Sequence, residues 1–101
     1  MSQTDSPVAV TAMLTARPGS EARAAELIAG IVAATQRHDG MLRYEAQQQL
    51  DAPRNFTFIE QWTSRTTLDA HLATPELLAF RAAAAEVFEG PADVRLWRLV
   101  K

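Results

Sequence analysis

The chain has 101 residues, a formal charge of −2 and 48% hydrophobic residues, which suits one domain built around one hydrophobic core. It contains no cysteine, which excludes disulfides, thiolate nucleophiles and cysteine-bound metals, and its two histidines leave little for an all-histidine metal site. The nearly balanced charge argues against general binding to nucleic acid or to a membrane surface.

The N-terminus is polar and lacks the basic and apolar segments of a signal peptide. No run approaches the roughly 20 apolar residues that are needed to span a bilayer. We therefore expect a disordered tail over residues 1–7, one domain over residues 8–101, and a cytoplasmic protein.

Alternating apolar residues predict a strand over residues 8–16, followed by a turn. Ser20 is the expected N-cap of a helix that runs to roughly Arg37. Gly40 is the expected left-handed residue that closes this helix.

A second alternation predicts a strand over residues 41–49, with Leu42 and Tyr44 on the same face. Residues 50–55 predict a hairpin loop, because they contain aspartate, proline and asparagine. An aromatic strand is expected over residues 56–62.

Ser64 is the expected cap of a short helix, and Thr74-Pro75 predicts the start of another helix. This last helix is expected to stop at Gly90-Pro91, before a final strand over residues 94–100. The order β-α-β-β-α-β, with the second helix broken, is typical of the ferredoxin-like α+β fold.

In such a fold the helices cover one face of the sheet, so the other face is solvated or paired. Apolar residues fall on both faces of the predicted strands, including Met13, Ile59, Trp97 and Leu99. An apolar sheet face of this kind is an expected partner surface, and pairing two sheets face to face gives a symmetric homodimer.

The stretch from Phe58 to Pro75 reads FIEQWTSRTTLDAHLATP. It closely resembles the signature of the antibiotic biosynthesis monooxygenase domain family, in its small quinol-monooxygenase-like branch. The Arg17-Pro18-Gly19 turn, the run from Asp39 to Glu45 and Gly90-Pro91 fit the same pattern. The resemblance therefore covers nearly the whole chain.

The resemblance implies a dimeric α+β barrel with a pocket between sheet and helices in each subunit. Some members of this family oxidise phenols or quinols with molecular oxygen, without a metal, flavin or haem. The substrate's deprotonated ring supplies the electrons. The implied function is a cofactor-independent monooxygenase that acts on a quinol-like or polyphenol-like aromatic substrate with oxygen.

Three catalytic residues follow from the same resemblance. Trp62 would stack on the substrate, although a core aromatic is the alternative. His71 would accept a phenolic proton, or else be a structural histidine bonded to a backbone carbonyl. Arg81 would stabilise an oxygen anion, unless it forms a surface salt bridge with Glu76 or Glu86.

Three further residues are expected to line the substrate pocket: Phe58, Glu60 and Tyr44. The alternation of apolar residues buries Glu60, either as pocket lining or paired with an arginine across the sheet. Tyr44 could bond to a ligand or simply pack.

The chain also departs from the family pattern. Glu76 stands where many relatives have a second histidine, and Phe58 and Leu68 stand where polyketide-oxidising members use asparagine and tyrosine. His38 is expected only to cap a helix end. Two other functions stay open: a cofactor-free isomerase that uses His71 with Glu60 or Glu76, and a non-enzymatic protein that binds a small aromatic molecule.

Overall fold

The computed structural model describes residues 6–100. Its elements are, in order, β1 (Val8–Ala16), α1 (Glu21–Thr35), β2 (Met41–Gln48), β3 (Asn55–Trp62), α2 (Arg65–Leu72), α3 (Pro75–Val87) and β4 (Phe88–Trp97). This order confirms the ferredoxin-like α+β fold, with the second helix divided into α2 and α3. Residues 1–5 of the expected tail, and Lys101, lie outside the described residues.

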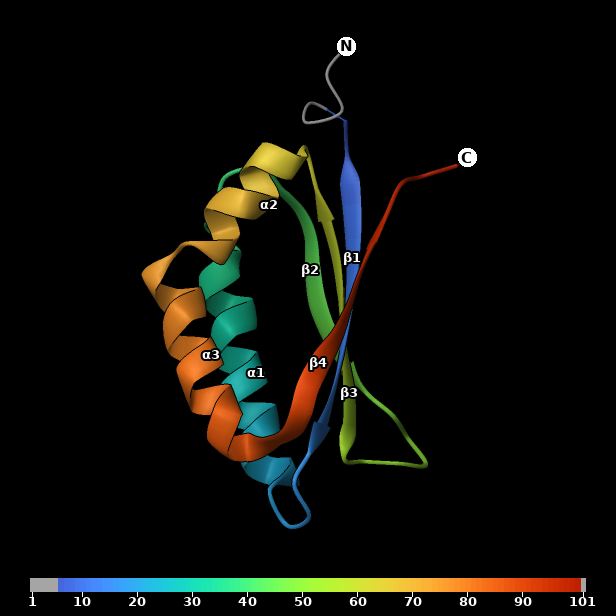
Figure 1. Ribbon diagram of the computed structural model, residues 1–101, viewed down its shortest axis with the longest axis vertical. Coiled ribbons are helices and arrows are strands. Elements are labelled where there is room, and N and C mark those ends of the chain that lie inside the picture. Colours follow the sequence, from blue (N-terminus) through green and yellow to red (C-terminus); the bar gives the residue numbers. More distant parts are fainter. Residues whose placement is uncertain (1–5, 101) are drawn as a thin grey trace.

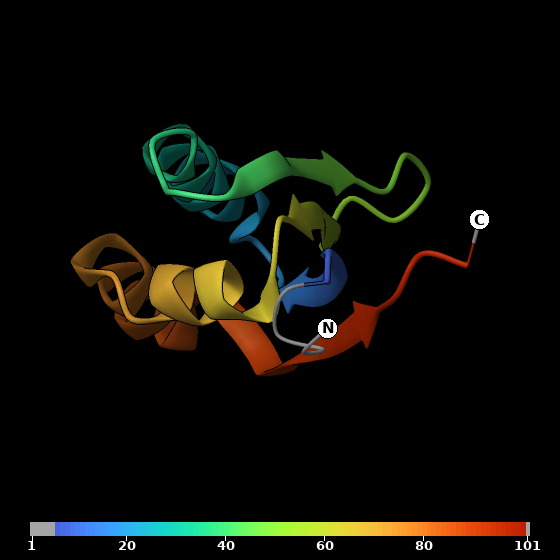
Figure 2. The same cartoon turned by 90° about the horizontal axis from the view of Figure 1, so that it is seen from above.

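The four strands form one antiparallel sheet in the order β2-β3-β1-β4. All three helices lie on one side of this sheet (Figure 1). Seen from above, α1 lies on the β2 side of the helix layer and α3 on the β4 side (Figure 2). Within the described residues, no helix is long and apolar enough to cross a membrane. The core lies between the two layers and includes Val10, Ile28, Ile31, Phe58, Leu68 and Leu77.

Helix α1 begins where the sequence predicts, but it lacks the expected side-chain cap. Ser20 occupies the N-cap position and its side chain makes no capping hydrogen bond. The Glu21 carboxylate accepts at 2.9 Å from the backbone N–H of Gly19, in the turn before the helix. The helix ends at Thr35, two residues before the expected end, and Gly40, with φ of +77°, turns the chain into β2.

Strand β2 contains a register shift between Met41 and Arg43, which are paired with Trp62 and Gln61 of β3. The extra residue, Leu42, is exposed, although the alternation placed it on the buried face with Tyr44. A bulge moves each residue before it to the opposite face, so alternation alone mispredicts Leu42.

The starts of α2 and α3 agree with the sequence. The Ser64 hydroxyl accepts from the backbone N–H of Thr67 at 3.2 Å, and the Thr67 hydroxyl bonds back to the Ser64 N–H. The Thr74 hydroxyl accepts from the Leu77 N–H at 3.3 Å, with Pro75 at the first helical position. These caps satisfy N–H groups that a helix start leaves unpaired.

The last strand is the largest difference from the prediction. β4 starts at Phe88, directly after α3, and passes through Gly90-Pro91 instead of starting at residue 94. The strand lies at a sheet edge, where proline's missing N–H costs no ladder bond. Its pairing with β1 shifts register between Met13 and Thr15, close to Gly90, whose φ is +68°. A bulged edge strand therefore accommodates a dipeptide that usually ends an element.

The sheet face opposite the helices is more polar than expected. Met13 of β1 and Trp97 of β4 are about half exposed there, and the half-buried Ile59 of β3 lies on the same face. The Trp97 indole N–H donates to the Thr11 hydroxyl at 2.9 Å. Charged and amide side chains of β2, β3 and β4 surround this group, because the strand registers place them on the same face: Arg43, Glu45, Gln47, Gln61, Asp93 and Arg95.

Gly40 is the glycine at which an added side chain should destabilise the fold most. A Cβ there would lie 2.5 Å from Thr67 Cβ and 2.6 Å from the Thr63 hydroxyl, and the positive φ adds strain. We expect Gly40→Ala to lower the free energy of unfolding by about 3 kcal/mol or more, measured by urea denaturation.

Gly19→Ala is the matched control, since Gly19 has φ of +85° and a Cβ added there would meet nothing within 4 Å. This substitution should lower the free energy of unfolding by only about 1 kcal/mol, which is the cost of placing alanine in a left-handed backbone conformation. Gly30 lies within α1, where an added Cβ would meet nothing within 4 Å. Gly30→Ala should therefore raise the free energy of unfolding by up to about 1 kcal/mol, because alanine favours the helix more than glycine does. Equal losses in Gly40→Ala and Gly19→Ala would show that contact with Thr67 is unimportant.

Candidate functional site

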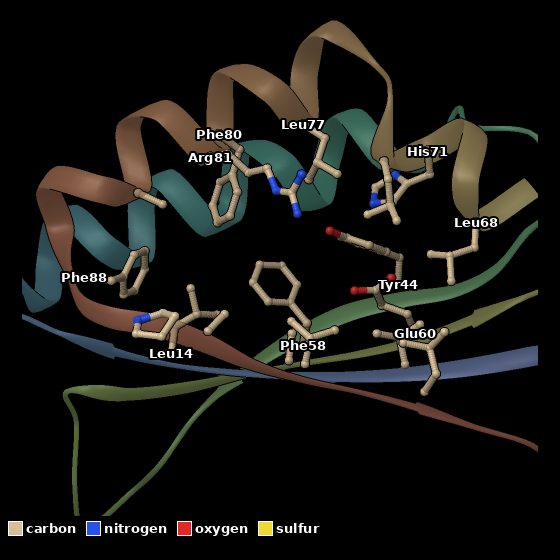
Figure 3. A pocket seen from close by; sticks show the side chains of 18 of the residues that line it. Leu14, Tyr44, Phe58, Glu60, Leu68, His71, Leu77, Phe80, Arg81 and Phe88 are labelled. Carbon is tan, nitrogen blue, oxygen red and sulfur yellow. The ribbon is translucent and has the colours of Figure 1, made fainter.

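A cavity of about 490 Å³ lies between the helix-side face of the sheet and helices α2 and α3 (Figure 3). Most of its wall is apolar and comes from β1, β3, β4 and α3. Val94 and Leu96 of β4 line it while remaining largely exposed, so the cavity opens toward this edge of the sheet. The side chains that form its wall include Val10, Leu14, Phe58, Leu77, Phe80 and Phe88.

Four side chains bring polar or charged atoms to this wall: Tyr44, Glu60, His71 and Arg81. Tyr44 and Glu60 are direct partners in the antiparallel register of β2 and β3, so their side chains leave the same face of the sheet. His71 is in the last turn of α2, and Arg81 comes from α3. Five of the six predicted site residues therefore line one cavity, and the sixth, Trp62, does not.

Glu60 is a buried carboxyl group whose hydrogen-bond donor is Trp62. The Trp62 indole Nε1–H donates to Glu60 Oε1 at 2.9 Å, so the expected arginine partner across the sheet is replaced by a neighbour on the same strand. Burial raises the pKa of Glu60 from 4.5 to about 7, and the bond from Trp62 opposes this only in part. Near neutral pH this group can therefore either give or take a proton.

His71 is buried and neutral. Burial, and to a smaller extent the neighbouring His38, lower the pKa of its imidazole from 6.5 to about 4, and Glu76 opposes this change only in part. The ring packs against Trp62, with centroids 4.5 Å apart, and against Tyr44, with centroids 5.2 Å apart. A neutral imidazole in an apolar cavity can accept a proton from a bound ligand.

The ring of His71 bonds to another histidine and not to a backbone carbonyl. Its Nδ1 lies 2.8 Å from Nδ1 of His38, and Nε2 of His38 lies 2.8 Å from Oε2 of Glu76. His38 is therefore more than the helix cap that its sequence position predicted. Local sequence could not reveal this contact, because 33 positions separate the two histidines and only the packing of α2 against the turn between α1 and β2 joins them.

Trp62 does not line the cavity. Its side chain is fully buried behind Glu60 and His71, at the end of β3. This placement leaves no indole face for a substrate, so the expected stacking on a substrate has no support in the structure. The indole fills the space between the sheet and α2. There it donates a hydrogen bond to Glu60 and packs against the ring of His71, and these two residues do line the cavity.

Arg81 reaches from α3 into the cavity, and its guanidinium points toward the end where Tyr44 and His71 lie (Figure 3). The salt bridges considered for it are not formed, since Glu76 contacts His38 and Glu86 lies 3.8 Å from Arg23. Within residues 6–100 no ion pair of Arg81 is found. Its charge is thus available to a ligand anion.

Tyr44 completes the polar end of the cavity. Burial, helped by the nearby charge of Glu60, raises the pKa of its phenol well above the ordinary value of 10, so the group stays protonated. A protonated phenol is a hydrogen-bond donor. Together, these four side chains can take up a proton, donate hydrogen bonds and stabilise an anion inside an apolar wall.

The raised pKa of Glu60 predicts a pH dependence of stability. A group whose pKa is higher in the folded state stabilises it below the unfolded value of 4.5, and this contribution disappears as pH rises through about 7. We expect the free energy of unfolding of the wild type, relative to Glu60→Gln, to fall by up to about 3 kcal/mol between pH 4 and 8. Urea denaturation at several pH values measures this difference, and His71 cancels because both proteins carry it.

Glu45→Gln is a control with the opposite sign. A hydrogen bond from Arg43 lowers the pKa of the half-buried Glu45, so the wild type should gain stability relative to this variant as pH rises. A difference between wild type and Glu60→Gln that does not change with pH would contradict the raised pKa.

Comparison with known proteins agrees with the fold. The family model described as antibiotic biosynthesis monooxygenase matches residues 7–83. Rv0793 of Mycobacterium tuberculosis, a provisionally assigned monooxygenase, is 32% identical over 89 residues, which cover 88% of this chain and 87% of that protein.

Solved structures give the same result. The structure of Rv0793 superposes with a TM-score of 0.89 at 28% identity, covering 95% of this chain and 97% of that one. PA3566 of Pseudomonas aeruginosa superposes with a TM-score of 0.89 at 22% identity, covering 99% and 100%, and shows the fold alone. The chain belongs to the antibiotic biosynthesis monooxygenase family.

Proposed function

We propose that the protein is a cofactor-independent monooxygenase that oxidises a quinol-like or polyphenol-like aromatic substrate with molecular oxygen. The observation that carries the proposal is the placement of a neutral His71 and a cationic Arg81 on one mainly apolar cavity of about 490 Å³. Membership of the monooxygenase family supports it. A cavity of this size and polarity suits an aromatic small molecule.

The proposed oxidation balances with the substrate as the sole reductant of molecular oxygen. One oxygen atom of O₂ enters the ring of a hydroquinone, the other leaves as water, and the product is a hydroxyquinone. The phenolate is a better electron donor than the neutral phenol, so removal of the phenolic proton comes first. The protein's task is to bind the ring, accept that proton and stabilise the anion.

Each cavity side chain has a role in this scheme. His71 accepts the phenolic proton at Nε2, since its Nδ1 is engaged by His38. Arg81 stabilises the phenolate or the oxygen anion that follows. Glu60 and Tyr44 hydrogen-bond a second oxygen of the substrate, and Phe58 packs on the ring. Trp62 holds Glu60 and His71 in place.

Oxygen uptake with a panel of hydroquinones tests the proposal. We expect uptake above autoxidation, with kcat/KM lowered by about 100-fold in His71→Gln and in Arg81→Gln, because each removes a group that stabilises the transition state. Arg65→Gln is the matched control, since Arg65 is exposed on α2, pairs with Asp69 and does not line the cavity. Uptake no faster than autoxidation with every hydroquinone would overturn the proposal.

One observation favours a second candidate, a cofactor-free isomerase. Glu60 and His71 both line the cavity, and one has a pKa near 7 while the other is a neutral base, as acid–base chemistry requires. The two functions differ in their need for oxygen. Turnover that continues under anaerobic conditions would favour the isomerase, and ligand binding without any turnover would favour a binding protein.

We further propose that the protein acts as a homodimer formed through the sheet face that carries Met13, Ile59 and Trp97. Two of these three apolar side chains are about half exposed there, and the charged residues around them could pair between two copies. A face of this composition resembles the centre and rim of a protein interface.

Mass measurement in solution by light scattering checks the dimer. We expect the wild type to have the mass of two chains and Met13→Asp to have the mass of one, because a buried, unpaired carboxylate would oppose association. Leu78→Asp is the control: Leu78 is equally exposed, but on α3, and its replacement should leave the dimer intact. A wild type with the mass of one chain would contradict this proposal.

A further inference from the structure

We infer that Glu76, His38 and His71 form a proton relay that connects the cavity to solvent, with His38 as its positioning residue. This inference rests on the proposed function for the role of His71. It assigns to His38 a task beyond the helix cap that its sequence position predicted, and it connects Glu76 to His71 through His38.

The three side chains form a continuous line of hydrogen bonds across three segments of the fold. His71 comes from the end of α2, His38 from the turn between α1 and β2, and Glu76 from the first turn of α3. The two contacts, His71 Nδ1 to His38 Nδ1 and His38 Nε2 to Glu76 Oε2, are both 2.8 Å long. Each distance lies within the range of a direct hydrogen bond.

Exposure increases step by step along this line. His71 is 2% exposed and lines the cavity, the His38 side chain is 12% exposed, and the Glu76 side chain is 47% exposed. The relay therefore starts in the cavity and ends in water. A proton that leaves a bound substrate therefore has a path to water that is separate from the opening of the cavity at the β4 edge.

The hydrogen bonds determine which nitrogens carry protons. The Glu76 carboxylate is only an acceptor, so Nε2 of His38 carries the proton that it receives. A neutral His38 then has an unprotonated Nδ1, and His71 must donate to it from its own Nδ1–H. This leaves Nε2 of His71 unprotonated. The relay thus prepares His71 as a base.

Proton transfer can proceed along the same bonds. When Nε2 of His71 takes a proton from the substrate, its Nδ1 proton moves to Nδ1 of His38, and His71 is neutral again. The charge now lies on His38, beside the Glu76 carboxylate, which also lies in the first turn of α3 where the helix dipole favours an anion. The Nε2 proton of His38 then passes by way of Glu76 to water. One proton has then moved from the substrate to solvent, and each imidazole holds the opposite tautomer. The second proton that the departing oxygen atom needs to become water returns along the same bonds in the reverse direction, which restores the starting tautomers.

Moving the charge outward has a physical benefit. A cationic imidazole is unfavourable in the buried position of His71, whereas His38 has an ion-pair partner and a partly solvated ring. The arrangement extends the logic of a carboxylate that orients a catalytic histidine, with a second imidazole inserted between the two groups.

Nitrogen-15 NMR of the imidazole rings tests the relay without any substrate. Near pH 7.5 we expect wild-type His71 to carry its proton on Nδ1, with Nε2 unprotonated. His38→Ala removes the acceptor, so the Nε2–H form of His71 should become the major one. Glu76→Gln should retain the Nδ1–H form, since the amide oxygen still accepts from His38 Nε2–H. Asp39→Asn, an exposed neighbour without a place in the relay, should change nothing.

Kinetics with an active hydroquinone separate positioning from binding. We expect His38→Ala to lower kcat by about tenfold or more and Glu76→Gln to lower it by about tenfold, with KM unchanged in both, because neither residue lines the cavity. Asp39→Asn should keep the kcat of the wild type.

The outcomes distinguish the relay from the proposed function. An Nε2–H form of His71 in the wild type, or an unchanged tautomer in His38→Ala, overturns the relay even if oxygen uptake is observed. The absence of oxygen uptake in the wild type overturns the monooxygenase, while the NMR result still decides the relay. The wild-type spectrum alone is decisive if His38→Ala fails to fold.

Discussion

The indole of Trp62 is the side chain on which the polar end of the cavity depends. It is fully buried at the end of β3, donates its N–H to Glu60 and packs its ring against His71. Because a buried indole N–H needs an acceptor and a buried carboxyl needs a donor, each group satisfies the other. The result is that a carboxyl from the sheet and an imidazole from α2 are held beside one rigid aromatic ring, at the base of an otherwise apolar cavity.

Desolvation then determines the chemistry of these groups. The same apolar surroundings raise the pKa of Glu60 and lower the pKa of His71, because burial disfavours the charged form of each. Near neutral pH the carboxyl titrates and the imidazole stays neutral, so its free ring nitrogen can accept a proton. Arg81, which enters from α3 at the exposed side, keeps its charge and balances any anion that forms between them.

Most of the fold could be predicted from local patterns. The caps at Ser64 and Thr74, the β1 strand and the order of elements all follow from short-range periodicity and hydrogen-bonding chemistry. The differences occur where pairing between strands overrides local preference. A register shift exposes Leu42, and an edge position lets β4 run through Gly90-Pro91. No local pattern encodes a bulge, because a bulge is a property of two strands.

Short-range patterns in the chain were enough to specify the fold class and the burial of Glu60, since alternation and capping act over a few residues. Resemblance to a family, carried by the sequence, also predicted His71 and Arg81 as site residues, and both line the cavity. The position of Trp62 behind the cavity and the link from His71 through His38 to Glu76 depend instead on tertiary packing. These contacts join residues that are 33 and 38 positions apart in the chain, and only the packing of helices and turns brings such residues within hydrogen-bonding distance.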